Sequence, residues 1–209
     1  MPQPEQRPRF AILGSGRGSN AVALMKEFRR GALPAELAVV IANVREAGIL
    51  AQAQQLGYPA VLIESAGRTR SEHEQLCREC LQGYGVDHLL LAGYLRILSP
   101  EFVHGFSGVI LNIHPALLPD FPGLDAVARQ WEAGVRVAGA TVHFVDAGVD
   151  TGPTLLCGSL EVRGDEGADG LAERIRTEVE HIIYPRAVRL LLERIARGAP
   201  LHGRERGGA

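Results

Sequence analysis

The chain has 209 residues, of which 46% are hydrophobic, and its formal net charge is −2 at pH 7. This length and apolar content suit one domain, or one domain with two lobes, around an ample core. The slightly acidic balance argues against nucleic acid as the main partner, because binding to a phosphate backbone usually needs a basic surface. The apolar runs are too short to cross a bilayer, so no membrane partner is expected.

Both ends of the chain predict flexible tails. Residues 1–8 are polar and proline-rich and lack the apolar stretch of a signal peptide, which favours a cytoplasmic protein. Residues 198–209 are rich in glycine and charge. The three cysteines form no disulfide framework in a chain of this size. Cys77 and Cys80 have CxxC spacing, but they lie in a helical pattern without a second pair of metal ligands, so packing is favoured over redox or zinc chemistry.

Between the tails, apolar runs alternate with helical patterns, which predicts a wound, mostly parallel α/β sheet flanked by helices. The expected strands in this part are Arg9 to Leu13, Leu37 to Ala42, Ala60 to Ile63, His88 to Ala92 and Val109 to Ile113. The expected helices are Asn20 to Arg30, Ala47 to Leu56, Thr69 to Gln82 and Ser99 to His104. Capping rules place Ser19 or Asn20 and Ser99 as N-caps, and Gly31, Gly57 and Gly83 as helix stops.

The second half breaks this rhythm. Gly139 to Val145 and Thr154 to Val162 read as longer, alternating strands, so we expect an antiparallel addition to the sheet. A short helix is expected at Ala126 to Ala133, and a long one at Asp169 to Ile195. Pro185 lies inside the long helix and must start a new segment or kink it, because proline lacks the backbone donor.

Two polar residues end the fifth strand. Alternation along a strand projects Asn112 and His114 to the same side, and Pro115 then begins a stiff loop. The ends of strands in an open parallel sheet are where ligands bind. An Asn amide can donate to an oxyanion, and a His can carry a proton near neutral pH. The alternative is an Asn that satisfies backbone groups and a His that caps a loop.

A glycine-rich loop, Gly14 to Asn20, follows the first strand and opens the first helix. Such a loop exposes backbone N–H groups beside a helix N-terminus and can bind a phosphate. It is a poor dinucleotide fingerprint, because Ser19 occupies the position of the third glycine and the second strand ends in Asn43 rather than an acidic residue. A glycine-rich turn without a ligand is the alternative.

Four separated motifs together resemble the folate-dependent formyltransferases, and the resemblance runs from about Arg9 to about Arg197. The first motif resembles the corresponding segment in those members of the family that act on glycinamide ribonucleotide, and it narrows the resemblance to them. The motifs are Ser15-Gly16-Arg17-Gly18-Ser19-Asn20, Leu91 to Pro100, Asn112 to Pro119 with Phe121-Pro122-Gly123, and Val142 to Pro153.

The resemblance implies transfer of a formyl group from 10-formyltetrahydrofolate, a co-substrate, to the amine of glycinamide ribonucleotide in purine biosynthesis, without a metal. Asn112 would donate to the oxyanion of the tetrahedral intermediate. His114, held cationic by Asp150, would be a second donor, and Asp150 would move the proton from the attacking amine to the leaving nitrogen. The partners would then be small molecules, with the protein a monomer or homodimer.

Ligand contacts follow from the same resemblance. It implies one domain over residues 9–197, with a lobe of about 9–108 for the ribonucleotide phosphate and a lobe of about 109–197 for folate and catalysis. Contacts to the ribonucleotide would come from Gly18, Ser19, Asn20, Gly93, Pro115 and Glu180. The folate would be bound by Leu95, Arg96, Ile97 and Leu98 and by Val145, Asp146, Ala147, Gly148 and Val149.

Three alternatives remain open at this stage. His143 could complete a two-His-one-carboxylate metal site, although a supporting role in the active site is favoured. The closest functional rival is formyltetrahydrofolate hydrolase, which usually carries an additional N-terminal regulatory domain, whereas eight residues precede the first strand here. A non-catalytic nucleotide-binding module would use the glycine-rich loop but leave Asn112, His114 and Asp150 unexplained.

The family resemblance also predicts a cis Leu118–Pro119 bond.

Overall fold

The computed structural model describes residues 7–201, so the predicted tails 1–8 and 198–209 lie mostly outside the described residues. The chain divides into two compact units, with the boundary after Ile110. Seven strands are hydrogen-bonded in the order β3-β2-β1-β4-β5-β6-β7, and the last two pairings are antiparallel. The predicted class is confirmed: a wound, mostly parallel α/β sheet with antiparallel strands added in the second half.

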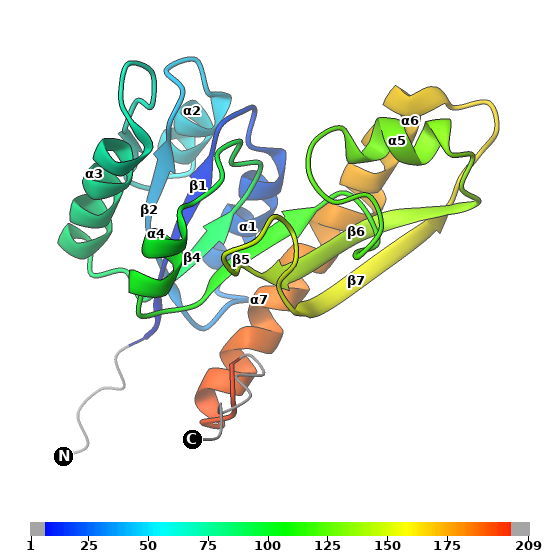
Figure 1. The fold of residues 1–209 in the computed structure, drawn as a ribbon. Helices are drawn as coiled ribbons and strands as arrows, with labels where there is room; N and C mark the ends of the chain where they lie inside the picture. Colours follow the sequence, from blue (N-terminus) through cyan, green and yellow to red (C-terminus); the bar gives the residue numbers. More distant parts are fainter. Residues whose placement is uncertain (1–6, 202–209) are drawn as a thin grey trace, which may run out of the picture. The chain divides into compact units, whose positions relative to one another are not determined.

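The first unit alternates strands and helices as predicted (Figure 1). Its elements are β1 (Arg9–Gly14), α1 (Ser19–Arg29), β2 (Glu36–Ala42), α2 (Gly48–Gln55), β3 (Ala60–Leu62), α3 (Arg70–Gly83), β4 (His88–Leu91) and α4 (Pro100–Gly105). β1 pairs in parallel with both β2 and β4, and its inner residues are buried on both faces. This burial explains the unbroken apolar runs of the sequence, which are typical of parallel sheets.

Local capping decides where several helices begin and end. Ser99 caps α4 as predicted, because its hydroxyl accepts from the Phe102 N–H. The N-cap prediction for α1 was wrong, since Gly18 holds that position in the left-handed region with φ 81° and both Ser19 and Asn20 are already helical. Gly83 was also wrong as a stop. It is the last residue of α3, and the left-handed turn comes two residues later, at Gly85.

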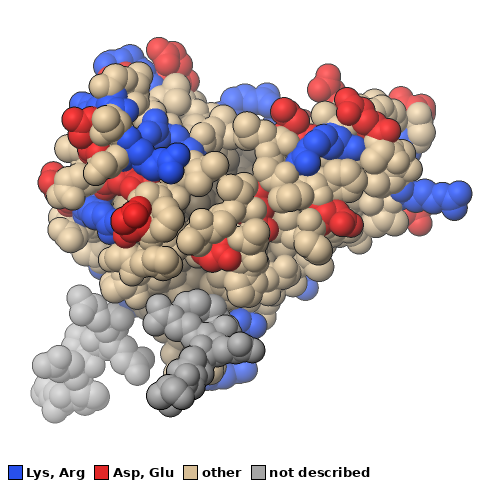
Figure 2. Space-filling view, viewed as in Figure 1, with Lys and Arg blue, Asp and Glu red and all other residues tan. Residues whose placement is uncertain are grey.

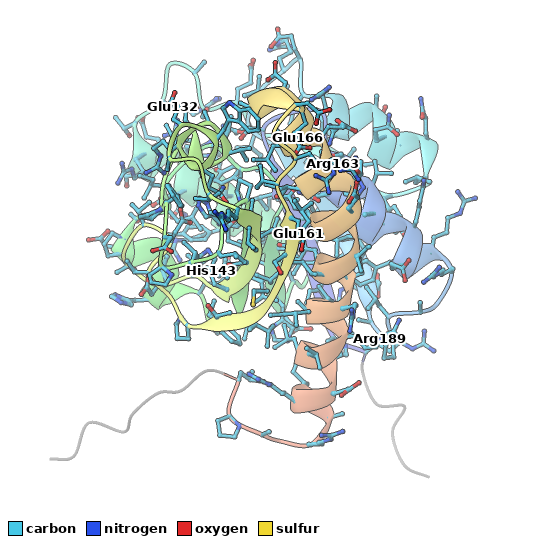
Figure 3. All side chains as sticks on the ribbon, turned by 90° about the vertical axis from the view of Figure 1, so that its right-hand side faces the viewer. Glu132, His143, Glu161, Arg163, Glu166 and Arg189 are labelled. Carbon is cyan, nitrogen blue, oxygen red and sulfur yellow. The ribbon has the colours of Figure 1, made fainter. Side chains whose placement is uncertain are left out.

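The second unit contains three strands and one long helical stretch. Its elements are β5 (Ile110–His114), α5 (Ala126–Glu132), β6 (Val137–Phe144), β7 (Thr154–Glu161), α6 (Gly167–Arg174), the π-helical segment η1 (Ile175–Glu180) and α7 (His181–Ala196). η1 and α7 pack on β6 and β7. Arg174 joins β7 to this stretch by donating to the Glu161 carbonyl and to Glu166. Figure 3 shows Glu161 and Glu166, the two acceptors, where the chain passes from β7 to α6.

The long helix changes its winding rather than breaking at Pro185. Pro185 is the fifth residue of α7 and cannot donate to the carbonyl of His181, four residues earlier. The new helical segment begins at His181, and the preceding turn is π-helical. The prediction that Pro185 starts a new segment is therefore wrong, because α7 begins four residues upstream and runs through the proline. π-Helical turns occur frequently at functional sites.

β6 differs from its predicted pattern. Seven of its eight residues are buried, so it does not alternate, whereas β7 beside it alternates between half-buried and exposed residues along most of its length. Because successive side chains of a strand point to opposite faces, the seven consecutive buried residues mean that both faces of β6 are covered, one of them by the helical stretch. On the face shown in Figure 2, basic and acidic side chains of the described residues are interspersed. Within residues 7–201, no helix has the length and apolarity needed to cross a membrane.

Candidate active site

The candidate site in the second unit is built on the pairing of β5 with β6. Asn112 and His114 occupy alternate positions on β5, and the antiparallel register places His143 of β6 directly opposite Asn112. Figure 3 shows His143 on β6. Asp150 comes from the loop between β6 and β7 and lies within 3.4 Å of all three side chains. The structure therefore brings the three predicted catalytic residues and His143 together.

Asp150 receives several donors in a half-buried position. Its Oδ2 accepts from the Gly123 N–H at 2.8 Å and lies 3.2 Å from His114 Nδ1. Its Oδ1 lies 3.3 Å from Asn112 Nδ2. Burial by itself would raise the pKa of this carboxyl group. When the neighbouring histidines are protonated, the hydrogen bonds from His143 and Gly123 and the positive charges of the two histidines outweigh burial and lower the pKa to about 2. Asp150 is thus a carboxylate at neutral pH.

His114 is oriented by an acceptor at each ring nitrogen. Its Nε2 lies 2.8 Å from the Phe121 carbonyl oxygen, which can only accept, and its Nδ1 faces the Asp150 carboxylate. A neutral ring carries one N–H and would turn a lone pair toward one of these oxygens. The geometry therefore suits the imidazolium form, in which both nitrogens donate. Only 5% of the residue is exposed, which shields this pair from water.

The hydrogen bonds of His143 also fix the orientation of the Asn112 amide. His143 Nδ1 lies 2.9 Å from the Phe144 carbonyl and must donate to it. In the neutral ring, Nε2 then bears the lone pair and accepts from Asn112 Nδ2 at 3.2 Å. The second amide hydrogen of Asn112 points to Asp150. The two acceptors thus agree on which side of the amide carries the nitrogen. Protonation of His143 would instead turn Nε2 into a donor toward Asp150.

The backbone around the site is strained. The described non-glycine residues with positive φ are Phe121 at 53°, Asp125 at 55° and Asp150 at 56°. Two of them contact His114, one through its carbonyl and one through its carboxylate. Residues held in this region cost free energy and cluster at functional sites. The Leu118–Pro119 bond is cis, as predicted.

Two supporting residues were missed from the sequence. Thr141 lies opposite His114, donates to the Ala116 carbonyl at 2.7 Å and accepts from the Leu118 N–H at 3.1 Å. Gln130 of α5 is 2% exposed and donates to the Pro115 carbonyl at 2.8 Å. Both side chains satisfy the backbone of the loop that follows His114. For Thr141 a signal existed, because it shares the strand face of His143, two residues away.

The predicted ribonucleotide residues are distributed over both units. Gly18, Ser19 and Asn20 form the start of α1, where N–H groups lack helical partners. Gly93 has φ 69° and accepts from the Ser15 N–H. In the second unit, Pro115 follows β5. Glu180 ends the π-helical segment and is only 7% exposed, so it is not a surface charge.

The predicted folate residues form two loops, one in each unit. Leu95 and Ile97 are 71% and 55% exposed, unusual for large apolar side chains, whereas Leu98 is buried and could offer a ligand only its backbone. Arg96 lies between them and is partly exposed. In the second loop, Asp146 accepts from the Gly148 N–H and the Thr151 hydroxyl, which folds the turn, and Val149 is 44% exposed. The turn also includes Val145 and Ala147.

The alternatives based on metal or thiol chemistry find no geometric support. Among residues 7–201, no group of three or more His, Cys, Asp or Glu side chains is arranged to hold a metal ion. Cys77 is buried in α3, and burial raises the pKa of its thiol to about 12, so it is not a nucleophile at neutral pH.

Comparisons with known proteins agree with this fold. The Formyl transferase family matches residues 8–188. Phosphoribosylglycinamide formyltransferase of Bacillus subtilis is 35% identical over 185 residues, which cover 88% of this chain and 94% of that protein. The human trifunctional purine biosynthetic protein adenosine-3 is 37% identical over 188 residues, 90% of this chain but 18% of that protein.

Solved structures show the same similarity. The crystal structure of glycinamide ribonucleotide transformylase 1 from Symbiobacterium toebii has a TM-score of 0.87 and 41% sequence identity, and the match covers 92% of this chain and 91% of that one. That of phosphoribosylglycinamide formyltransferase from Brucella melitensis has a TM-score of 0.84 and 37% identity, over 90% and 96% of the two chains. The chain therefore belongs to the formyl transferase family.

Proposed function

We propose that this protein transfers the formyl group of 10-formyltetrahydrofolate to the amine of glycinamide ribonucleotide, giving N-formylglycinamide ribonucleotide and tetrahydrofolate. The observation that carries the proposal is the convergence of Asn112, His114 and Asp150 in a member of a formyl transferase family. Several full-length relatives bear the name phosphoribosylglycinamide formyltransferase. The folate is a co-substrate, and the reaction needs no metal.

The chemistry begins when the amine attacks the formyl carbon and its oxygen becomes an oxyanion. Asn112 supplies one N–H donor to that oxygen. The Nδ1–H of His114, which faces Asp150 Oδ2 in the structure, supplies another as the carboxylate loses its negative charge. In the ligand-free geometry, both Asn112 hydrogens point to His143 and Asp150. When Asp150 takes the amine proton at Oδ1, that oxygen stops accepting from Asn112. One amide hydrogen is then released as the oxyanion forms.

The proton then passes to the leaving nitrogen of the folate. The pKa of about 2 makes Asp150 a weak base, so it passes the proton on rather than retaining it. His143 supports this exchange, because its Nε2 contacts both Asn112 and Asp150. Collapse of the intermediate breaks the bond between the formyl carbon and the folate nitrogen and restores the carboxylate.

Binding is assigned to the two predicted lobes. In the lobe of about 9–108, the N–H groups of Gly18, Ser19 and Asn20 would hold the phosphate, with Gly93 beside the ribonucleotide. Pro115 and Glu180 would contact it from the lobe of about 109–197. The folate would lie against Leu95, Arg96, Ile97 and Leu98 and against the loop Val145 to Val149. We place the protein in the cytoplasm, as a monomer or homodimer.

The decisive experiment varies the acceptor. Release of tetrahydrofolate from 10-formyltetrahydrofolate is followed with glycinamide ribonucleotide, with the phosphate-free riboside, and with neither. We expect release to require the ribonucleotide and the riboside to be a far worse acceptor, because remote phosphate binding helps to position the amine. Rapid release without any amine would identify a hydrolase instead. Ribonucleotide binding without turnover would identify a non-catalytic nucleotide-binding module.

A further inference from the structure

A buried hydrogen-bonded chain joins three loops in the first unit. The Ser15 hydroxyl, directly after β1, donates to Asn43 Oδ1 at 2.6 Å, and Asn43 directly follows β2. The same hydroxyl oxygen accepts from the Leu95 N–H, beyond β4, at 2.8 Å. Ser15 and Asn43 are 7% and 5% exposed. Ser15 belongs to the glycine-rich loop, whereas Leu95 belongs to the predicted folate segment.

The direction of every bond in this chain is fixed. A backbone N–H can only donate, so the Ser15 oxygen accepts from Leu95 and its own hydrogen must go to Asn43. The Asn43 amide nitrogen in turn donates to the Ser65 hydroxyl at 3.2 Å, and that hydroxyl donates to the Asn43 carbonyl. Each member is satisfied, so loss of the Ser15 oxygen leaves a backbone donor without its partner.

The two ends of the chain depend on Ser15 to different degrees. The glycine-rich loop keeps two backbone bonds that need no Ser15 side chain, from the Ser15 N–H to Gly93 and from the Ile49 N–H to Gly16. The described hydrogen bond of the Leu95 N–H is the one to the Ser15 hydroxyl. Leu98 is buried and anchors the far end of this segment. Leu95 and Ile97 hold their apolar side chains in solvent, so packing contributes little to fixing the Leu95 backbone.

We propose that Ser15, although it lies in the ribonucleotide loop, is a positioning residue for the folate: its hydroxyl holds the Leu95 backbone in place for binding. This inference rests on the proposed function, which assigns the folate to Leu95 and its neighbours. Loss of the hydroxyl then weakens folate binding more than ribonucleotide binding. The expected loss of folate binding comes from the missing hydrogen-bond acceptor and not from a change in side-chain volume.

The test compares Ser15→Ala and Ser15→Cys with wild type and with Ser65→Ala. The cysteine variant keeps the side-chain volume but offers a weak acceptor, so it should behave like the alanine variant. The matched control, Ser65→Ala, removes the far end of the same chain and leaves the bond between Ser15 and Leu95. Thermal unfolding checks that each variant is folded. The readouts are KM for each substrate and calorimetric binding of tetrahydrofolate, which needs no turnover.

We expect the KM for 10-formyltetrahydrofolate and the Kd for tetrahydrofolate to rise about tenfold in both Ser15 variants, the usual order for a buried donor left unpaired. The ribonucleotide KM should stay within about twofold, and Ser65→Ala should resemble wild type. Equal rises in both KM values, a wild-type-like cysteine variant, or unchanged tetrahydrofolate binding would overturn the inference. If wild type binds tetrahydrofolate but transfers no formyl group, the proposed function fails and the binding data still test Ser15. If wild type binds no tetrahydrofolate, both fail.

Discussion

Four histidines are buried to a similar extent, two in each unit, but their partners differ. In the first unit, His73 and His88 are 1% and 8% exposed, and in the second His114 and His143 are 5% and 2% exposed. His73 bonds to the Tyr94 hydroxyl, and His88 Nδ1 accepts from the Val109 N–H. The second pair faces the Asp150 carboxylate. Burial alone therefore does not mark a histidine as functional, because the partner decides its charge.

The consequences for ionisation follow from those partners. Burial lowers the pKa of His73 and of His88, so both stay neutral in the folded protein at neutral pH. In the second unit, a carboxylate, two rings and an amide form one network in which protons can move. Under the proposed function, the first unit would contribute to binding through backbone groups and satisfied polar bonds, and the second would carry the titratable groups that the chemistry needs.

The largest expected effect separates His114 from His88. His114→Asn removes the second oxyanion donor, so kcat should fall by about 10²–10³. His88→Asn is the matched control: its Oδ1 can still accept from the Val109 N–H, and kcat should stay within about twofold. Steady-state kinetics with saturating substrates, together with thermal unfolding, measure both changes. A His114 variant with kcat within tenfold of wild type would remove the proposed role.

A smaller effect tests whether the first unit binds through its backbone. Gly18→Ala would place a Cβ 2.7 Å from the Ile49 Cβ at φ 81°, so the loop must shift and the ribonucleotide KM should rise about tenfold. Gly31→Ala is the matched control, since φ is 72° there and a Cβ would meet nothing within 4 Å. Gly31→Ala should lower the free energy of unfolding and leave the ribonucleotide KM unchanged. Equal ribonucleotide KM values in the two variants would contradict phosphate binding at this loop.

Much of the fold could be predicted because one local signal dominated each element. Apolar runs marked the buried strands. Alternation predicted that Asn112 and His114 project to the same side, the family resemblance added Asp150, and the structure places both side chains beside it. Predictions failed where long-range packing decided the outcome. β6 is covered on both faces, which its own sequence does not reveal. His88 was expected to begin a strand and does begin β4, but nothing in the sequence around it indicates that it is buried.

Other features of the site depend on geometry that the sequence does not encode locally. The positive φ values of Phe121 and Asp150 arise in residues that rarely adopt them, so no composition rule indicates them. Gln130 and Thr141 support the loop after His114 through bonds to its carbonyl groups, contacts that appear only when β6 and α5 are in place. The predicted ligand roles of the individual residues stay predictions.

The smallest expected effect is a pH dependence of the free energy of unfolding, caused by the neutral histidines His73 and His88. The pKa of His88 is lowered by burial, partly offset by Asp87, and that of His73 is lowered by burial and then by Arg96. At a pH below 6.5, the pKa of a histidine in the unfolded chain, the unfolded chain therefore binds more protons than the folded one. Stability present above pH 6.5 is lost as the pH falls through the folded pKa values.

His88→Asn removes one of these titrations, so its free energy of unfolding should fall less steeply between pH 7 and pH 5 than that of wild type. The difference in slope is bounded by about 1.4 kcal/mol per pH unit, the contribution of one proton. Urea unfolding at pH 7, 6 and 5 measures it. Asp150 does not interfere, because its lowered pKa of about 2 keeps it charged throughout, and its contribution is lost only as the pH falls below about 4. An unchanged slope in His88→Asn would mean that His88 is protonated in the folded protein and that the contrast between the two pairs is wrong.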